Sequence, residues 1–352
     1  MFQHEISRLR AAANTSVRVM IVLVVTLFSL TSLAGPATAA QSLTKVSVAL
    51  DWYPNANHAG LFLAEARGYF AEEGLEVELY TPADPTVVLQ TVGAGRDTFG
   101  ISYQTDVLLA RAEQVPVVSV AALVQRPLLG VMSLHERTIT RPRDLVGKTV
   151  GYPGIPSQEA FLATMLENDG ASLDDVELVN VGFDLVPAVV SGQVDAVMGA
   201  YWTHETLLAE QAGFAVDFLN VEDWGVPRYY ELVLVSSEAT ISSDPDTVRA
   251  FLRAMQRGYA DAAREPAAAL DALAAASPEL DREVESEGLV LLAPAWTDGV
   301  PAIGVQSSEQ WESYADWMVD HALIPDTLRV ADAYTTDLIT GSEATAVATP
   351  SA

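Results

Sequence analysis

Hydrophobic residues recur along the chain in short runs that alternate with polar positions, and most runs are followed by a more amphipathic stretch. In the first third of the chain this alternation predicts strands at residues 45–50, 76–80 and 98–102, and helices between them at 61–70 and 87–92. The connections are short. The order strand, helix, strand, helix, strand therefore predicts a parallel sheet with right-handed crossovers.

The same pattern begins again after a polar connection at residues 138–148. The remaining strands are expected at 115–124, 128–134, 149–152, 176–181, 195–201 and 229–237, with helices that begin near residues 156 and 185. The glycine stop and the following strand at residues 93–100 resemble those at 192–199. This weak internal duplication predicts two lobes built on one plan.

The expected fold class is α/β, with parallel-rich mixed sheets in two lobes and a cleft between them. We expect a discontinuous first lobe at residues 40–131 and 232–335 and a continuous second lobe at residues 132–231. A cap signal at residues 243–246 starts a long amphipathic helix, and alanine-rich helices follow it. The polar tail at residues 336–352 is expected to be disordered.

The first 39 residues have the pattern of a signal peptide. Three arginines within the first 18 residues precede an apolar run at residues 19–30, and Ala37-Thr38-Ala39 matches a small-residue cleavage site. The alternative is an uncleaved membrane anchor. Because the chain has no Cys, it lacks the residue that a lipoprotein would need at this site. We therefore expect a soluble protein that is exported to the periplasm and cleaved near Ala39.

Charge and residue types exclude several classes of function. The formal net charge is −28, and it becomes −30 without the signal segment, which argues against binding to nucleic acid or to an anionic membrane. The lack of Cys excludes thiol nucleophiles, iron–sulfur clusters and Cys-ligated zinc. The five His are dispersed, and no hydrolase or phosphate-loop motif occurs. We expect no catalytic residue, no metal and no cofactor.

The most distinctive stretch is the turn between the first strand and the first helix, at residues 51–60. It contains the indole of Trp52, the carboxamides of Asn55 and Asn57, and the imidazole of His58. Such turns lie at the carboxyl ends of strands, where open α/β sheets bind ligands. A flat stacking face with donors and acceptors beside it suits a planar heterocycle. The alternative is that Trp52 belongs to the core and the two Asn only shape the turn.

Other aromatic and acidic residues stand at predicted strand ends. Aromatic pairs that face a cleft could hold a flat ring between them, and a carboxylate could accept hydrogen bonds from ring amino groups. Each of these residues could equally be packing inside its lobe or beside the hinge. The candidates for ligand contact are, together with Trp52, Asn55 and His58, the residues Tyr103, Tyr152, Tyr201, Glu205, Tyr230 and Glu231.

The turn and three later segments resemble a known family, the solute-binding proteins related to eukaryotic thiamin-pyrimidine synthases. The resemblance rests on the stretch from Asp51 to His58 and on residues 68–75, 99–104 and 144–152, and it spans about residues 45–330. It implies a type II periplasmic-binding-protein fold and delivery of a small solute to an ATP-driven (ABC) importer. Members that take up formylaminopyrimidine, hydroxymethylpyrimidine or riboflavin are the most similar subgroups.

The resemblance also implies roles for individual residues. An aromatic side chain of the first turn stacks on the ring in these proteins, which is Trp52 here, and Asn55 and Tyr103 would face the same cleft. On the second lobe the family segment corresponds to Tyr201, Trp202 and Glu205. The synthases of this superfamily are iron-dependent and have a Cys-rich segment. This chain has no Cys, which argues against an enzyme.

The sequence thus favours a monomeric binding protein for a planar nitrogen heterocycle, first of all a thiamin pyrimidine precursor. Its expected partners are that solute and the membrane subunits of an ABC importer with their ATPase. Riboflavin is the alternative ligand, and an alkanesulfonate or taurine is a weaker one because few Arg lie in the candidate loops. The competing class is a secreted pyrimidine-processing enzyme that would use His58 or Glu205 in acid–base chemistry.

Overall fold

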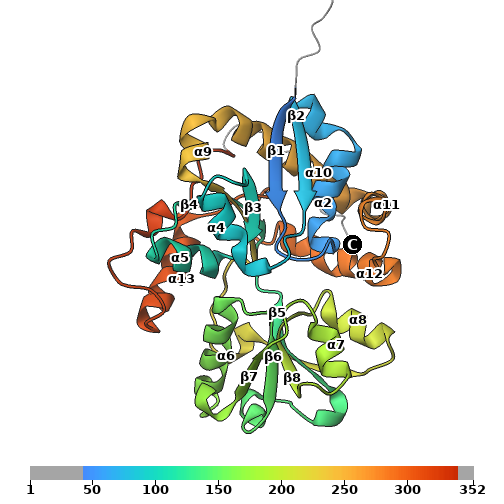
Figure 1. The fold of residues 1–352 in the computed structure, drawn as a ribbon, viewed down its shortest axis with the longest axis vertical. Helices are drawn as coiled ribbons and strands as arrows, with labels where there is room; N and C mark the ends of the chain where they lie inside the picture. The colour runs from blue at the N-terminus through green and yellow to red at the C-terminus, as the bar shows by residue number, and fades with distance from the viewer. Residues whose placement is uncertain (1–42, 340–352) are drawn as a thin grey trace, which may run out of the picture. The chain divides into compact units, whose positions relative to one another are not determined.

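Two five-stranded mixed sheets organise the computed structural model, which describes residues 43–339 (Figure 1). The expected signal peptide and residues 340–352 of the expected tail lie outside the described residues. Within the described part of the chain, no helix is long and apolar enough to cross a membrane. The two-lobed α/β fold predicted from the sequence is confirmed.

The first sheet has the strand order β2-β1-β3-β10-β4. β1 pairs in parallel with β2 and β3, and β10 pairs antiparallel with β3 and β4. Alternating burial in β1 and complete burial in β3, β4 and β10 explain the hydrophobic patterns of these segments. The strands are β1 (Thr44–Ala49), β2 (Leu75–Tyr80), β3 (Phe99–Ser102), β4 (Val117–Val124) and β10 (Leu232–Ser237).

Helices from both ends of the sequence surround this sheet, as the blue, cyan and orange elements of Figure 1 show. Asp244 caps the long helix α10 by accepting a hydrogen bond from Thr247 N at 3.1 Å, as the sequence signal predicted. The helices of this lobe are α2 (Ala59–Ala66), α3 (Tyr69–Glu72), α4 (Val88–Gly93), α5 (Gln104–Ala112), α9 (Glu238–Ser243), α10 (Pro245–Arg264), α11 (Pro266–Ala276), α12 (Arg282–Leu292) and α13 (Ser308–Asp320).

The second sheet repeats this arrangement with the order β7-β6-β8-β5-β9. β6 pairs in parallel with β7 and β8, and β5 pairs antiparallel with β8 and β9. Its elements are β5 (Leu129–Leu134), β6 (Thr149–Tyr152), α6 (Pro156–Asn168), β7 (Glu177–Asn180), α7 (Leu185–Val190), β8 (Ala196–Tyr201), α8 (Glu205–Gln211) and β9 (Val216–Asn220). The shared strand order matches the weak internal duplication of the sequence.

Two segments of chain connect the sheets. The first runs from β4 to β5 through residues 125–128, and the second returns from β9 to β10 through residues 221–231. In each sheet the fourth strand, β10 or β5, is the one that follows a crossing and runs antiparallel. The lobe boundary expected between residues 131 and 132 falls inside β5, which pairs with β8 and β9 of the second sheet.

The end of the described chain packs on the first sheet. Ser119 of β4 forms an isolated bridge with Tyr334, and the Thr335 amide donates to the Ser119 carbonyl at 2.9 Å. Leu338 is 9% exposed, although it lies within the segment 336–352 that was expected to be disordered. The last strand-like pairing therefore secures the chain after α13 to the first lobe.

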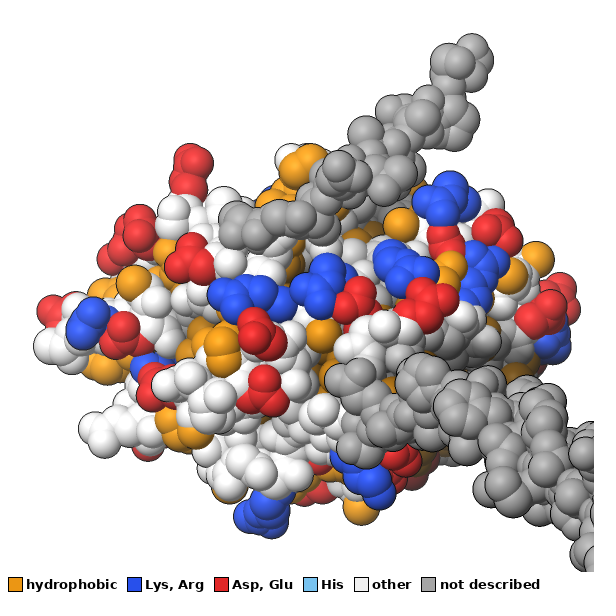
Figure 2. All heavy atoms as spheres, turned by 90° about the horizontal axis from the view of Figure 1, so that it is seen from above, with side chains coloured by type: hydrophobic (Ala, Val, Ile, Leu, Met, Phe, Trp, Pro, Cys, Tyr) orange, Lys and Arg blue, Asp and Glu red, His pale blue; other side chains and the backbone are white. Residues whose placement is uncertain are grey.

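The outer surface of α10 carries several arginines that are paired with acidic residues. Arg253 and Arg257 reach across to Glu73 and Glu72 beside α3, at 2.6 Å and 2.8 Å. On the face of the molecule in Figure 2, basic side chains likewise have acidic neighbours. Because these pairs are exposed, they contribute little to stability, at most about 1 kcal/mol each. The positive charges of these arginines on α10 are therefore balanced by neighbouring carboxylates.

Candidate functional site: the cavity between the two lobes

The turn after β1 is held in shape by its own side chains. Asn55 precedes the short 3₁₀ helix η1 (Ala56–His58), and its Oδ1 accepts hydrogen bonds from the backbone N and the Nδ2 of Asn57, both at 2.9 Å. His58 Nδ1 accepts from the Asn55 amide at 3.2 Å. This reciprocal cap fixes the path of the chain at the end of β1. Asn55 Nδ2 in turn donates to the Tyr53 carbonyl at 3.1 Å.

A buried carboxylate, Asp51, joins the turn to the end of β3. Since His58 Nδ1 is an acceptor, its Nε2 carries the hydrogen and donates to Asp51 Oδ1 at 2.9 Å. Tyr103, the residue before α5, donates its hydroxyl to Asp51 Oδ2 at 3.1 Å. Burial raises the pKa of the Tyr103 hydroxyl well above its ordinary value, and the nearby Asp51 charge adds to this rise. Tyr103 therefore remains a hydrogen-bond donor at neutral pH.

The second lobe contributes a bulge in β8. Gly130 of β5 pairs with Ala200 and Val131 pairs with Met198, so Gly199 has no partner in the ladder. Its φ is +106°, and a Cβ at this position would lie 2.3 Å from Gln158 Oε1. Glycine is therefore required both by the backbone and by the close approach of Gln158. The bulge therefore brings Gly199 and Gln158 together at the end of β8.

The end of β8 also positions an acidic side chain. Glu205 is the first residue of α8, and its Oε2 accepts from the Tyr201 amide at 2.8 Å. A carboxylate at this place is stabilised by the N-terminal end of the helix dipole. The Tyr201 hydroxyl points away to Glu231 Oε1, at 3.0 Å. Burial raises the pKa of Tyr201 well above its ordinary value, and the charge of Glu231 acts in the same direction.

A cavity lies where these groups meet, between strand ends of both sheets. Its volume is about 20 Å³, close to the room that one water occupies, whereas ligand pockets run to about 300–1,000 Å³. A heterocycle can therefore enter only when the lobes separate or the lining side chains move. The lining contains two carboxylates, two carboxamides and three aromatic rings, and it consists of Asp51, Trp52, Asn55, Tyr103, Gln158, Gly199, Tyr201 and Glu205.

One side of this cavity is closed by aromatic contacts between the lobes. The Trp52 ring lies edge-on to Phe183, which follows β7 in the second lobe, with ring centroids 4.5 Å apart. Tyr53 also contacts Phe183 at 4.5 Å, although more than half of Tyr53 is exposed. The three rings form an aromatic contact between the lobes, and they must separate when a ligand enters beside Trp52.

Five of the nine side chains selected from the sequence line the cavity: Trp52, Asn55, Tyr103, Tyr201 and Glu205. The other four do not. His58 is buried below the turn, Tyr230 is buried and accepts from the Ser307 amide at 2.9 Å, and the half-buried Tyr152 packs against the main core. Glu231 is buried between the two crossing segments.

Three lining residues were not selected from the sequence: Asp51, Gln158 and Gly199. Asp51 stood inside the distinctive turn and could have been chosen. Gln158 and Gly199 give no signal of their own, because only the bulge of β8 brings them together. Gln158 Oε1 is buried without a hydrogen-bond partner among the described residues, so it is an acceptor that a ligand could satisfy.

A further contact joins the lobes beside the cavity. Asp106 of α5 accepts hydrogen bonds from Ser157 in the first turn of α6, at 2.6 Å from Oγ and 3.4 Å from the amide. Burial raises the pKa of Asp106 to about 6, although the hydrogen bonds from Ser157 lower it. The carboxylate lies at the positive end of the α6 dipole.

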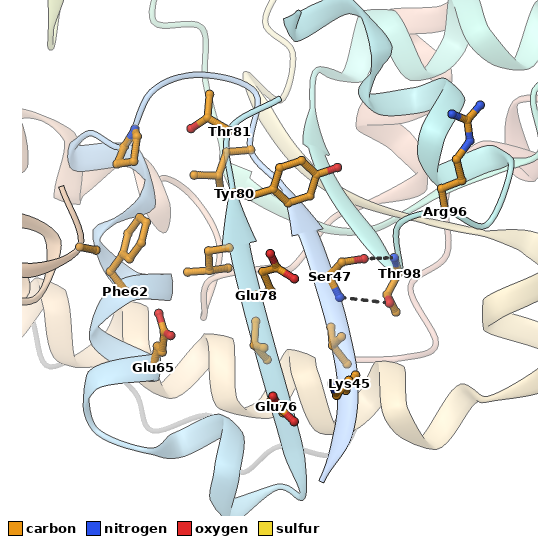
Figure 3. Close-up of a pocket in the computed structure, with 16 residues that line it drawn as sticks. Lys45, Ser47, Phe62, Glu65, Glu76, Glu78, Tyr80, Thr81, Arg96 and Thr98 are labelled. Carbon is orange, nitrogen blue, oxygen red and sulfur yellow. Dashed lines mark hydrogen bonds between the residues drawn. The ribbon is translucent and has the colours of Figure 1, made fainter. Parts of the chain in front are cut away.

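A larger concavity, about 720 Å³, runs along the edge strand β2 of the first sheet. Figure 3 shows Glu76 and Glu78 on this strand, with Phe62 of α2 on one side. Thr98 and Ser47 form two backbone-to-side-chain hydrogen bonds on the other side, at 3.1 Å and 3.3 Å. All its walls come from the first lobe. A ligand there would not contact the second lobe and could not favour closure, so the smaller interlobe cavity is the better candidate.

The arrangement of the lobes and the cavity defines an architecture, the two-lobed fold of periplasmic binding proteins. The structure matches that of the alkanesulfonate-binding protein SsuA from Xanthomonas axonopodis pv. citri bound to MOPS, with a TM-score of 0.68, over 84% of this chain and 99% of that one. At 17% sequence identity, this likeness concerns the fold alone.

Sequence comparison then gives the family. The chain belongs to the NMT1/THI5-like family, whose model matches residues 55–269. It is 40% identical to the formylaminopyrimidine-binding protein of Halalkalibacterium halodurans, over 91% of this chain and 98% of that protein. It is 31% identical to the riboflavin-binding protein RibY of Chloroflexus aurantiacus, over 88% of this chain and 90% of that protein. The family resemblance inferred from the turn is confirmed.

Some relatives of the chain are named as enzymes. The chain is 30% identical to a 4-amino-5-hydroxymethyl-2-methylpyrimidine phosphate synthase of Aspergillus parasiticus, over 65% of this chain and 70% of that protein. The two relatives named as binding proteins thus align over a larger share of the chain than this synthase does. Family membership alone therefore determines neither the ligand nor whether the protein is an enzyme.

Proposed function

We propose that this protein is the periplasmic substrate-binding subunit of an ABC importer and that its ligand is a thiamin pyrimidine precursor of the formylaminopyrimidine or hydroxymethylpyrimidine type. The observation that carries the proposal is the composition of the interlobe cavity, where a carboxylate and an unpaired carboxamide oxygen stand beside aromatic rings. The relative with 40% identity, named for binding formylaminopyrimidine, supports the same ligand.

The chemistry of an aminopyrimidine fits these groups. Its ring is flat and can lie against Trp52, and its amino group can donate to Glu205 or to Gln158 Oε1. Hydrogen bonds to a buried carboxylate discriminate strongly, because an analogue without the donor leaves the charge unsatisfied. Since Asp51 and Glu205 are acidic and no basic side chain from residues 43–339 lines the cavity, an alkanesulfonate or a phosphorylated ligand is disfavoured.

Riboflavin is the second candidate, and the relative named RibY favours it. Its isoalloxazine ring is planar and carries an amide-like edge that could use the same donors and acceptors. The ring system is larger than a pyrimidine, so it would need a wider separation of Trp52 from Phe183. A secreted pyrimidine-processing enzyme is the competing class, and it would have to use Glu205 or a neighbouring group in acid–base chemistry.

Binding by a two-lobed protein couples the ligand to closure. Asp51, Trp52 and Asn55 belong to the first lobe and Gln158, Tyr201 and Glu205 to the second, so a ligand that contacts both groups stabilises the closed form. The closed form is then the state that membrane subunits with an ATPase would recognise. Export to the periplasm and cleavage of the N-terminal segment belong to this proposal.

The test is native mass spectrometry, with an absorption spectrum, on the protein purified from its periplasm. A colourless bound species with the mass of a pyrimidine supports the proposal, and a yellow species near the mass of riboflavin replaces it by the second candidate. If the protein is purified without ligand, thermal-shift titration with each compound decides, because a ligand that binds only the native state raises the melting temperature. Steady turnover of a pyrimidine would instead establish the enzyme.

A further inference from the structure

Three ionisable side chains from the two lobes meet behind the cavity. His204, the residue before α8, places Nδ1 at 2.8 Å from Glu205 Oε1 and Nε2 at 3.1 Å from Glu285 Oε1. Glu285 belongs to α12 of the first lobe, whereas His204 and Glu205 belong to the second. Both carboxylates are buried, and the imidazole is 12% exposed.

The geometry requires a charged imidazole. Each ring nitrogen faces a carboxylate oxygen, and a neutral imidazole could donate to only one of them. Burial lowers the pKa of His204, but the charge of Glu205 and the hydrogen bonds to both carboxylates outweigh it and raise the pKa to about 10. The carboxylates that face His204 are therefore those of Glu205 and Glu285. The three groups form an ion triad that bridges the lobes.

The triad is tied to the ligand-binding turn as well. Glu285 Oε2 accepts from the Ala56 amide at 2.6 Å, directly after Asn55. One turn further along α12, a Cβ on Gly288 would lie 2.8 Å from the Thr203 carbonyl. The helix therefore approaches the backbone beside His204 as closely as glycine allows. A continuous path of contacts runs from Ala56 through Glu285 and His204 to Glu205.

We propose that His204 and Glu285 form an interlobe clasp that holds the carboxylate of Glu205 in its ligand-facing orientation and exists only when the lobes are closed. The clasp rests on the proposed function in one respect, that Glu205 accepts a hydrogen bond from an amino-substituted heterocycle. His204 is then a positioning residue: it acts on the ligand through Glu205. Orientation of the acceptor and closure of the lobes are coupled through this imidazolium.

The clasp explains how Glu205 could be selective. Its Oε2 is held by the Tyr201 amide and its Oε1 by His204, so the carboxylate cannot turn away. Only the remaining lone pairs are directed toward the cavity, and a donor of the ligand must come to them. When the lobes separate, Glu285 moves away with the first lobe and one side of the clasp is lost. Glu205 then has a weaker hold in the open form.

The first test needs no ligand. Nitrogen-detected NMR of the His204 ring in the wild-type protein should show both ring nitrogens protonated at pH 8, and Glu285→Gln should lower the pKa of the ring. A wild-type ring that titrates near the ordinary His value of about 6.5, in a state whose distances between the lobes match this structure, would overturn the clasp whatever the variants do.

The second test measures binding of 4-amino-5-hydroxymethyl-2-methylpyrimidine by calorimetry. His204→Gln and Glu285→Gln should each weaken binding by about 10- to 100-fold, the loss expected for a hydrogen bond to a charged group. In a double-mutant cycle, His204→Gln should add little once Glu205→Gln is present. Fully additive effects would show that His204 acts only on the fold and would overturn the positioning role.

A matched control uses a second contact between the same two helices. Gln211 of α8 donates to Asp281 before α12 at 3.0 Å, without contact to Glu205. Gln211→Ala should leave affinity within about twofold, since the contact is exposed. Equal losses in Gln211→Ala and Glu285→Gln would overturn the specific role of the clasp.

Closure itself can be measured by distances between spin labels. Because the chain has no Cys, Asp174→Cys on the second lobe and Ser242→Cys on the first would be the only labelled sites. Both positions are exposed. Glu285→Gln should populate longer distances than Gln211→Ala does, and identical distributions would overturn the clasp. If the wild-type protein fails to bind the pyrimidine, the proposed ligand falls, while the NMR and distance measurements still decide the clasp.

Discussion

The amide of Leu128 donates to Glu231 Oε2 at 2.7 Å, so the two segments that connect the lobes are joined to each other. Leu128 lies directly before β5, and Glu231 lies directly before β10. The hydroxyls of Tyr229 and Tyr201 also donate to Glu231, at 2.9 Å and 3.0 Å. One buried carboxylate therefore accepts from both crossings and from the end of β8.

Glu231 should make the stability of the protein depend on pH. Burial raises its pKa to about 7, although the bonds from Leu128, Tyr229 and Tyr201 lower it. Since the native pKa lies above the unfolded one of about 4.5, its contribution is fully present below pH 4.5 and is lost as pH rises through 7. The free energy of unfolding, measured in urea, should fall by about 3 kcal/mol over this window from this group.

Glu231→Gln is the variant that isolates this effect. It should remove the part of the slope between pH 6 and 7 that Glu231 contributes, whereas the loss of stability above pH 7 that the raised pKa of His204 predicts should remain. It should also lower stability at pH 5 by about 1–3 kcal/mol, because the amide group offers one acceptor fewer to three donors. An unchanged slope in the variant would show that another group titrates there.

The sequence predicted the fold because each lobe is built from segments with clear periodicity. The strands β1, β3, β6 and β8 were expected within two residues of their observed bounds. β9 (Val216–Asn220) was not predicted, since it is short, half-buried and at the edge of its sheet. The expected lobe boundary fell inside β5 because a fully buried strand has no alternation of polar and apolar residues that could show which sheet it joins.

The site was predictable only where its residues are neighbours in sequence. Trp52 and Asn55 share one turn, and Tyr201 and Glu205 share another, so both pairs stood out. Gln158 became a lining residue because Gly199 bulges beneath it, which depends on the pairing of β8 with β5. Glu231 and His58 have the polar character of ligand contacts, yet their hydrogen bonds are satisfied inside the protein. Composition alone does not separate these cases.

Trp52→Ala should weaken binding of the pyrimidine by about 1–3 kcal/mol, because a stacked ring loses both its apolar contact area and its aromatic partner. Trp52→Phe should retain part of the affinity. Calorimetry measures both, with melting temperature as the check on folding. An effect below 0.3 kcal/mol in Trp52→Ala would place the ring of the ligand elsewhere.

A variant of Phe183, which contacts Trp52, can distinguish the effect of lobe closure on binding from the effect of ring stacking on Trp52. Phe183→Ala removes the edge-on partner in the second lobe while leaving the indole face intact. We expect faster ligand dissociation with a smaller loss of affinity than in Trp52→Ala, because aromatic pairs contribute about 0.5–1.5 kcal/mol. Stopped-flow tryptophan fluorescence measures the rate. A loss equal to that of Trp52→Ala would mean that Phe183 itself contacts the ligand.

Gly199→Ala should damage the site more than its small size suggests. The backbone has a φ of +106°, and the added methyl group would meet Gln158 Oε1 at 2.3 Å. We expect a loss of unfolding free energy of about 1–3 kcal/mol from backbone strain, and a loss of binding because Gln158 must move. The double variant Gly199→Ala/Gln158→Ala should recover stability in part but not binding. Full recovery of binding would exclude Gln158 from ligand contact.

Ser157→Ala tests the contact that crosses the lobes from α5 to α6. The Ser157 hydroxyl donates to Asp106 at 2.6 Å, and the pKa of Asp106, raised by burial to about 6, would rise further without this donor. The loss of stability should therefore be larger at pH 7.5, where the carboxylate is ionised, than at pH 5, where it is protonated.

The size of this difference follows from the charge on the acceptor. A hydrogen bond to an ionised group contributes about 1.5–3 kcal/mol and one between neutral groups about 0.5–1.5 kcal/mol, so Ser157→Ala should cost about 1 kcal/mol more at the higher pH. Asp106→Asn removes the titration and serves as the matched background, in which Ser157→Ala should have the same effect at both pH values. A pH-dependent effect that persists in Asp106→Asn would assign the titration to another group, whereas its disappearance would identify Asp106 as the carboxylate that joins the first lobe to the amino end of α6.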